Sequence, residues 1–297
     1  MRDGRIDTLL HLYEDGAFSR RDIFERLTRC AGSAAAATAA LASAGLLHAE
    51  PACPADVRVP EDAPDLQCES FAIYSEAGPL LVYQVRPKQA GGAPRPGVLV
   101  IHENRGLNDH IKDVTRRAGR AGFVGLGVDL LSRQGGTDQF PDPEQATAAY
   151  NRTRPEERRA DLISALLFLR EQSYVEDGRV GAVGFCAGGG NCFDLAVNAP
   201  ELNAAVVFYG TPPAPIEQIA RMQAPLLGIY PQLDRGTTGR VPELLTALLA
   251  ANKTFGVHIY ENTNHAFHND TGTRYDRAAA CDAWSKTVDF FARHLGA

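Results

Sequence analysis

The strongest constraint in this sequence is the alternation, from Phe71 onward, of short apolar runs with longer helical stretches. Runs such as 97–101 (GVLVI) and 204–208 (AAVVF) are short and rich in β-branched or small apolar residues, which is typical of buried strands. The stretches 109–122 and 155–172 instead place apolar residues three and four positions apart, as one face of a helix requires. Strands separated by helices form βαβ units. The sequence therefore predicts an α/β fold with a mainly parallel central sheet and helices on both faces.

The remaining elements follow the same pattern. Further strands are expected at 71–74, 80–86, 123–128, 179–185, 226–230 and 257–260, and further helices at 187–198, 241–252 and 275–294. In sheets of this kind the loops at the carboxyl ends of the strands carry the binding and catalytic residues. Those loops are therefore where functional side chains are expected.

The composition limits the classes of function. A chain of 297 residues with 44% hydrophobic side chains can build a core without a metal or a disulfide. Its 30 basic and 36 acidic residues give a net charge of −6, so no basic face for nucleic acid is expected. The sequence has neither a GxGxxG nucleotide motif, a P-loop lysine nor an HExxH zinc motif. We expect no cofactor and no metal.

Residues 1–65 differ from the rest and are interpreted as an N-terminal arm and linker in front of an α/β domain at 66–297. Residues 31–47 carry no charge, but this alanine-rich stretch is shorter than the roughly 20 residues of a membrane span, so no stable span is expected. The pair Arg20-Arg21, the uncharged stretch and a possible cleavage site at 47–49 together resemble a twin-arginine export signal.

A second interpretation of the arm remains open. Acidic residues such as Asp15 and Glu25 are unusual in an export signal. The arm could instead be a retained helical segment that packs on the body or on a second copy in a homodimer. The pattern favours a periplasmic or exported protein, with a cytoplasmic location as the alternative. In an exported protein Cys53 could pair with Cys68, and none of the six cysteines has the spacing of a zinc site.

The strand expected at 179–185 runs into Gly184-Phe185-Cys186-Ala187-Gly188, which has the spacing of a nucleophile elbow with cysteine as the nucleophile. Such a nucleophile lies on a tight, strained turn, where Gly184 and Gly188 leave room for neighbouring backbone. The helix that follows directs free N–H groups at the sulfur. They should lower the pKa of the thiol and offer the N–H of Ala187 to an oxyanion. The alternative is a buried structural cysteine before a glycine-rich turn.

Two downstream loops offer partners for a nucleophilic cysteine, in the order nucleophile, acid, histidine. Asp234 and His265 each follow an expected strand. His265 would take the proton of the nucleophile, and Asp234 would hold the imidazole in the correct tautomer and orientation. Alternatively, Asp234 is a turn residue, His265 is a surface residue, His268 serves in its place, or His265 and His268 together with His258 bind a metal.

Residues 68–297 resemble the dienelactone hydrolase family, the carboxymethylenebutenolidase-like α/β-hydrolases, and within it a subgroup with HENRGL and NHAFHND motifs. The resemblance covers about three quarters of the chain and implies an α/β-hydrolase fold. It also implies a catalytic triad of Cys186, Asp234 and His265.

The resemblance assigns further site residues. It implies that Glu103 contacts the resting thiol and swings away when substrate arrives, and that the backbone of Asn104 supplies the second oxyanion N–H. Arg133 matches an arginine that helps to hold a substrate carboxylate. A second substrate-binding arginine of the family is replaced by Asn269, which argues against the chlorinated dienelactone as substrate. Tyr209, at the end of a strand, either lines the pocket or packs in the core.

The sequence therefore predicts a hydrolase that cleaves an ester or lactone of a small molecule through a thioester on Cys186. A catalytically weak protein that uses the hydrolase fold for binding or as a scaffold is the alternative. A thiol redox sensor using Cys186 and Cys192 is a third possibility. It is disfavoured because residues six positions apart on a helix point in different directions.

Overall fold

The computed structural model describes residues 4–14, 20–44, 57–88 and 93–296, and it divides the chain into two compact units, residues 1–52 and 53–297. The two units are described separately. No helix in these described ranges is both long and apolar enough to cross a membrane.

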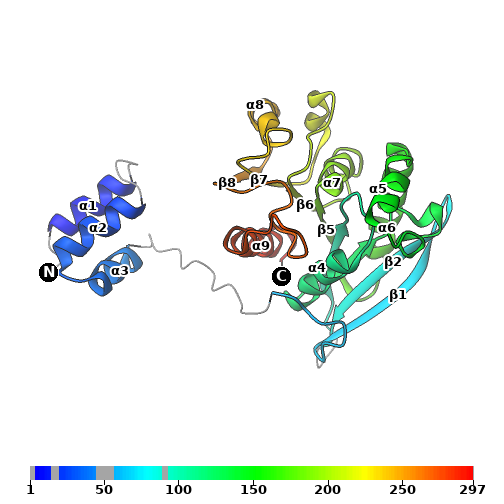
Figure 1. Cartoon of the computed structure of the whole chain (residues 1–297), viewed down its shortest axis with the longest axis horizontal. Coiled ribbons are helices and arrows are strands. Elements are labelled where there is room, and N and C mark those ends of the chain that lie inside the picture. The colour runs from blue at the N-terminus through cyan, green and yellow to red at the C-terminus, as the bar shows by residue number, and fades with distance from the viewer. Residues whose placement is uncertain (1–3, 15–19, 45–56, 89–92, 297) are drawn as a thin grey trace. The chain divides into compact units, whose positions relative to one another are not determined.

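The described part of the first unit is helical (Figure 1), with α1 (Gly4–Glu14), α2 (Arg20–Ala31) and α3 (Ala34–Ser43). These helices share a small apolar core, formed by Leu10, Ile23, Leu27, Ala37 and Leu41. The pair Arg20-Arg21 opens α2. The expected cleavage site at 47–49 lies outside the described residues.

The second unit is built on an eight-stranded sheet (Figure 1). Its strands are β1 (Leu66–Ser75), β2 (Gly78–Pro87), β3 (Arg95–Ile101), β4 (Val124–Val128), β5 (Val175–Phe185), β6 (Ala204–Phe208), β7 (Leu226–Pro231) and β8 (Phe255–Tyr260). The strand order is β1-β2-β4-β3-β5-β6-β7-β8. Strand β2 is antiparallel to both of its neighbours, and all other neighbours are parallel. The predicted mainly parallel sheet is confirmed.

Helices cover both faces of this sheet, as predicted. They are α4 (Asp109–Arg120), α5 (Pro143–Asn151), α6 (Pro155–Arg170), α7 (Ala187–Asn198), α8 (Val241–Ala250) and α9 (Arg277–Phe291). Short 3-10 turns lie at η1 (Ser132–Gln134), η2 (Thr137–Gln139), η3 (Ile216–Arg221) and η4 (Thr238–Arg240), and a π-helical turn, η5 (Ala292–Gly296), follows α9. Helices α5 to α8 pack on one face, whereas α4 and α9 pack on the other.

The central strands are apolar throughout because both of their faces are covered. In β3, Leu99 and Ile101 point to the core under α5–α8, whereas Val98 and Val100 point to the core under α4 and α9. Successive side chains of a strand alternate between faces. Alternate residues of the run GVLVI therefore pack in the two cores. This explains why apolar and polar residues do not alternate there.

The segment before β1 packs on the second unit. Val59 and Ala63 are buried in the α4/α9 core, although the sequence had placed them in the linker. The backbone N–H of Val59 donates to the carboxylate of Asp113 on α4 over 2.7 Å. Cys68 on β1 carries a free thiol, so the possible pair with Cys53 is not formed; Cys53 itself lies outside the described residues.

Candidate active site

Cys186 occupies a strained turn between β5 and α7. Its backbone has φ 55° and ψ −117°, a positive-φ conformation that few non-glycine residues adopt. The turn is so tight that a Cβ on Gly184 would lie 2.0 Å from the carbonyl oxygen of Gly188, and a Cβ on Gly188 would lie 2.3 Å from that of Ile101. Neither position tolerates a side chain, so these glycines are required for the reason that the sequence suggested.

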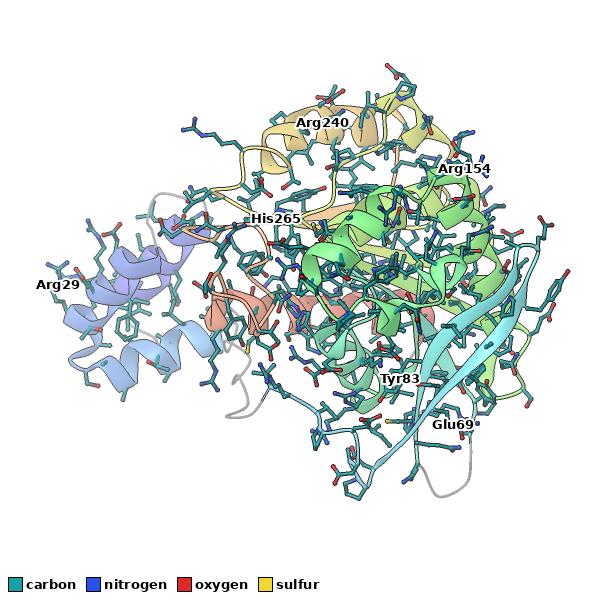
Figure 2. The ribbon with its side chains drawn as sticks, turned by 45° about the vertical axis from the view of Figure 1, so that its right-hand side comes forward. Arg29, Glu69, Tyr83, Arg154, Arg240 and His265 are labelled. Carbon is teal, nitrogen blue, oxygen red and sulfur yellow. The ribbon has the colours of Figure 1, made fainter. Side chains whose placement is uncertain are left out.

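The structure brings the three residues of the expected triad together. The Nε2 atom of His265, which is labelled in Figure 2, lies 2.9 Å from the Sγ atom of Cys186. On the other side of the ring, Nδ1 lies 2.5 Å from Oδ2 of Asp234. An ionised carboxylate can only accept a hydrogen bond, so Nδ1 carries the proton. Nε2 is then free to accept the proton of the thiol.

The loop after β7 holds Asp234 as a carboxylate. Besides His265, its acceptor oxygens receive hydrogen bonds from the hydroxyl of Thr237 over 2.6 Å and from the backbone N–H of Gly236 over 3.1 Å. Burial alone would raise the pKa of Asp234, but the hydrogen bonds from Thr237 and His265 outweigh burial and lower it. Asp234 is thus both a turn residue and the partner of the histidine.

His265 is positioned by a tight turn after β8 and by an aromatic wall. Ala266, the next residue, has φ 66°, and the N–H of Phe267 donates to the carbonyl of Asn264 within this turn. The ring of Tyr209 lies 5.0 Å from the imidazole of His265, centroid to centroid. Tyr209 is fully buried and has φ 41°, so it packs behind the imidazole at the end of β6. Strained residues thus gather at this edge of the sheet.

The thiol of Cys186 is less acidic than the sequence suggested. Burial is the main reason that its pKa rises to about 11, and the carboxylate of Glu103 raises it further. The N–H of Ala187 at the start of α7 hydrogen-bonds the sulfur and lowers the pKa, as expected for a helix N-terminus, but its effect is the smaller one. The thiol of Cys186 is therefore neutral at neutral pH, and the expected net lowering of its pKa is wrong.

Glu103 and Asn269 form a buried pair next to the thiol. The side-chain amide of Asn269 donates to Oε2 of Glu103 over 2.9 Å, and both side chains are about 5% exposed. The other oxygen, Oε1, has no hydrogen-bond partner among the described residues. Asn269 stands where the family resemblance leads one to expect a substrate-binding arginine. Here the residue holds the carboxylate of Glu103 instead.

The expected substrate-binding arginine, Arg133 in η1, makes an internal ion pair. Its Nε and Nη2 atoms bind the carboxylate of Asp161 on α6 over 3.1 and 2.8 Å. Sequence reasoning missed a different cation, Arg105, whose side chain is exposed and whose charge lowers the pKa of Cys186. Within the described ranges no ion pair or hydrogen bond engages its guanidinium. The sequence signal that could have identified Arg105 is its position directly after Asn104 in the HENRGL motif.

His258, His268 and Cys192 were alternative candidates for the catalytic histidine, a metal site or a redox pair. His268 is buried, with its ring 5.1 Å from that of Phe185, and His258 is exposed on β8. The described part of the chain holds no group of three or more His, Cys, Asp or Glu side chains that could bind a metal ion. Cys192 is fully buried and its thiol lies 3.6 Å from the carbonyl oxygen of Ala182, within the range of a weak S–H hydrogen bond.

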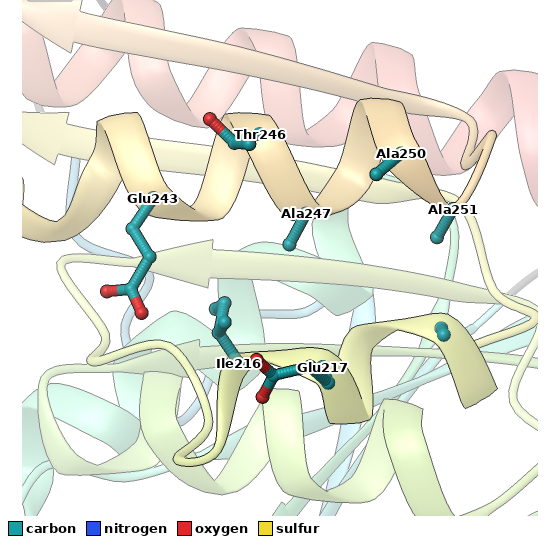
Figure 3. Close-up of a pocket in the computed structure, with 8 residues that line it drawn as sticks. Ile216, Glu217, Glu243, Thr246, Ala247, Ala250 and Ala251 are labelled. Atoms are coloured by element: carbon teal, nitrogen blue, oxygen red, sulfur yellow. The ribbon is translucent and has the colours of Figure 1, made fainter.

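A cavity of about 470 Å³ lies away from these residues, between η3 and α8 (Figure 3). It is lined mainly by apolar or small side chains, with Glu217 and Glu243 among them: Ile216, Glu217, Ala220, Glu243, Thr246, Ala247, Ala250 and Ala251. None of these residues belongs to the triad or to the loops around it. This cavity is therefore separate from the site of Cys186.

Comparisons with known proteins agree with the fold and the sequence resemblance. The model of the dienelactone hydrolase family matches residues 80–295. A protein of Saccharolobus solfataricus named "Putative carboxymethylenebutenolidase" is 32% identical over 67% of this chain and 90% of its own. A protein of the same name from Methylorubrum extorquens is 30% identical over 81% of this chain and 86% of its own.

A solved structure extends this similarity to three dimensions. The crystal structure titled "Putative Dienelactone Hydrolase from Klebsiella pneumoniae subsp. pneumoniae MGH 78578" superposes with a TM-score of 0.70 at 28% identity. The superposition covers 77% of this chain and 99% of that one. The second unit thus corresponds to an entire dienelactone hydrolase fold. The chain belongs to the dienelactone hydrolase family and is a hydrolase of carboxylic ester bonds.

Proposed function

We propose that this protein hydrolyses an ester or lactone of a small molecule through a thioester on Cys186, with His265 as the proton carrier and Asp234 as its orienting partner. The observation that carries the proposal is the unbroken line from sulfur to imidazole to carboxylate, with distances of 2.9 and 2.5 Å. Nucleophile, base and orienting acid in hydrogen-bond contact are the arrangement that covalent catalysis requires.

The reaction begins from a neutral thiol. As the Sγ atom of Cys186 attacks the substrate carbonyl, its proton passes to Nε2 of His265, and the positive imidazole is stabilised by Asp234. The carbonyl oxygen becomes an oxyanion, which accepts hydrogen bonds from the N–H groups of Ala187 and Asn104. Collapse of this intermediate breaks the bond to the leaving oxygen, which takes the proton from Nε2. Water then attacks the thioester with His265 as base, and the acid and the free thiol are released.

Glu103 provides a way to couple thiol activation to substrate binding. Its charge opposes formation of a thiolate on Cys186, so the resting enzyme is protected against adventitious reaction. A substrate that displaces this carboxylate removes the opposing charge and makes the sulfur more acidic. The unpartnered Oε1 atom leaves the side chain held on one oxygen only, by Asn269, which favours such a movement.

Two arginines are candidates for recognising an anionic group on the substrate. Arg133 is engaged by Asp161, whereas Arg105 presents an exposed guanidinium whose charge acts on Cys186. We therefore assign a substrate carboxylate, where one is present, to Arg105 rather than to Arg133. With Asn269 in place of the second family arginine, neutral esters and lactones are also expected to be accepted.

The test is a panel of activated esters and lactones, such as p-nitrophenyl acetate and dihydrocoumarin, assayed with the wild type, Cys186→Ala and Cys186→Ser. We expect turnover by the wild type and a loss of at least about 10³-fold in Cys186→Ala. Acid quenching during turnover should trap an acyl group on the peptide that contains Cys186. Undiminished turnover by Cys186→Ala would refute the thioester mechanism, whereas a wild type that turns over none of the panel would favour a binding or scaffold member of the family.

A further inference from the structure

His102, the first residue after β3, is completely buried and makes two hydrogen bonds with the backbone. The backbone N–H of Leu130 donates to its Nε2 atom over 3.0 Å. Its Nδ1 atom lies 2.5 Å from the carbonyl oxygen of Glu103. The imidazole therefore connects the loop after β3 with the loop after β4.

These two contacts determine the tautomer of His102. An amide N–H can only donate, so Nε2 is an acceptor; a carbonyl oxygen can only accept, so Nδ1 carries the hydrogen. Burial lowers the pKa of His102, which keeps the ring neutral. The neutral ring has one donor and one acceptor, and both are used. The Nδ1–H of His102 thus donates its hydrogen bond to the carbonyl oxygen of Glu103.

This hydrogen bond also determines where the next N–H points. In a trans peptide the C=O and N–H bonds both lie in the peptide plane and point in opposite directions across the C–N bond. The carbonyl oxygen of Glu103 is turned toward His102, so the N–H of Asn104, in the same peptide unit, points away from it. In the described ranges no protein group accepts a hydrogen bond from this N–H.

The loop that carries this peptide touches the nucleophile elbow. A Cβ on Gly188 would lie 2.4 Å from the carbonyl oxygen of His102, so backbone packs against backbone at the start of α7. Ala187, whose N–H faces the sulfur, lies in the same turn. Further along the loop, the hydroxyl of Thr137 accepts a hydrogen bond from the N–H of Leu107 over 2.7 Å. The loop that carries the peptide is therefore fixed before it, at His102, and after it, at Leu107.

We propose that His102 is a positioning residue for the oxyanion hole: its hydrogen bond to the carbonyl of Glu103 sets the rotation of the Glu103–Asn104 peptide, and thereby directs the N–H of Asn104 at the developing oxyanion. The inference rests on the proposed function. His102 touches no reacting atom. Its effect is transmitted through one peptide plane.

The test compares two reactions of the same sulfur. Hydrolysis of p-nitrophenyl acetate passes through an oxyanion, whereas alkylation of Cys186 by iodoacetamide forms none. His102→Leu removes both hydrogen bonds at similar volume, and we expect kcat to fall about 10²-fold or more, the typical loss for one oxyanion donor, while alkylation changes by less than about threefold. His102→Gln offers an amide donor and a carbonyl acceptor, and it should retain turnover within about tenfold of the wild type.

Thr287→Val is the matched control, because it also removes a buried hydrogen bond, from the Thr287 hydroxyl to Ala283 on α9, but lies far from this loop along the chain. It should lower the melting temperature without a selective loss of kcat. The proposal is overturned if His102→Leu keeps full kcat, or if its alkylation rate falls in parallel with its turnover. If His102→Leu does not fold, a 10²-fold loss of kcat in a folded His102→Gln overturns the proposal. Cys186→Ala in the same assay separates this outcome from failure of the proposed function, since only the latter leaves Cys186→Ala active.

Discussion

The thiol of Cys186 should ionise only at high pH, and the rate of its alkylation measures this directly. Its pKa is raised to about 11, against an ordinary value of 9.0. Each pH unit below the pKa lowers the thiolate fraction tenfold. At pH 8 the thiolate of Cys186 is therefore about a hundredfold scarcer than that of an ordinary thiol. Burial causes most of this shift, and a mutation cannot easily reverse burial, but the contribution of Glu103 can be removed.

Glu103→Gln deletes the negative charge at almost unchanged side-chain volume. A neighbouring charge shifts a pKa by roughly 1–3 units, and Glu103 is the second cause of the shift after burial, so the alkylation midpoint should fall by about one unit, equivalent to about 1.4 kcal/mol. A less basic thiolate is also a weaker nucleophile, which offsets up to about half of the gain on a logarithmic scale. The net expectation is an alkylation rate at pH 8 that is about three- to tenfold faster.

The assay follows iodoacetamide labelling of the Cys186 peptide by mass spectrometry between pH 7 and 11. The variants Cys30→Ser and Cys68→Ser show how much labelling comes from other cysteines, because Cys30 and Cys68 are the other free, at least partly exposed thiols among the described residues. Glu69→Gln is the matched control: Glu69 (Figure 2) is exposed on β1, four strands away from β5 in the sheet. A wild-type profile that levels off below pH 8, or a midpoint that Glu103→Gln leaves unchanged, would refute the electrostatic account.

Three further outcomes follow from the geometry. Asp234→Asn should lower kcat by about 10³–10⁴-fold, because an amide can stabilise the wrong tautomer of the histidine; kcat within tenfold of the wild type would contradict this. Arg105→Met should raise KM for a carboxylate-bearing ester but not for its neutral analogue, whereas Arg133→Met should lower the melting temperature; equal effects on both substrates would argue against carboxylate recognition. Asp270→Asn should lower the free energy of unfolding by about 2 kcal/mol at pH 7, because Arg117 and His110 lose a buried partner. The pKa of Asp270 is lowered in the folded protein, so this contribution is complete above about pH 4 and is lost as the pH falls further; urea unfolding at pH 3 and 7 should show a smaller difference at pH 3.

Much of the fold was predictable because its signals are local. The apolar runs at 97–101 and 204–208 coincide with β3 and β6, and the helical spacing at 155–172 coincides with α6. Helix α5 was missed. It is only nine residues long, and its N-terminal signal, Asp142 capping the N–H of Glu144 before a proline, also occurs in turns. A short helix inside a long loop has too few apolar positions to establish a period.

The convergence of Cys186, Asp234 and His265 could be predicted from the sequence for a topological reason. Cys186, Asp234 and His265 each follow a parallel strand, and β5, β6, β7 and β8 are consecutive neighbours in the sheet. The carboxyl ends of neighbouring parallel strands lie at one edge, so position along the chain determines position in space. The acidity of the thiol was not accessible in the same way. The pKa of Cys186 depends on burial and on the charge of Glu103, which lies in a loop far from Cys186 in the sequence.

Two polar pairs near Cys186 show what a sequence motif cannot predict. The motif gives the residue type, but the partner of each side chain is known only from the fold. Asn269 and Glu103 are 166 positions apart, and Arg133 and Asp161 are 28 apart on different elements. In the first pair, Asn269 replaces the expected substrate-binding arginine and holds Glu103; in the second, the expected substrate-binding Arg133 is held by Asp161. A conserved motif specifies a residue type and its backbone position, but the direction of a long side chain depends on which charge or amide lies nearest after folding. Substrate preference in this protein therefore has to be inferred from these partners, and Arg105, whose exposed guanidinium acts on Cys186, remains a candidate for an incoming anion.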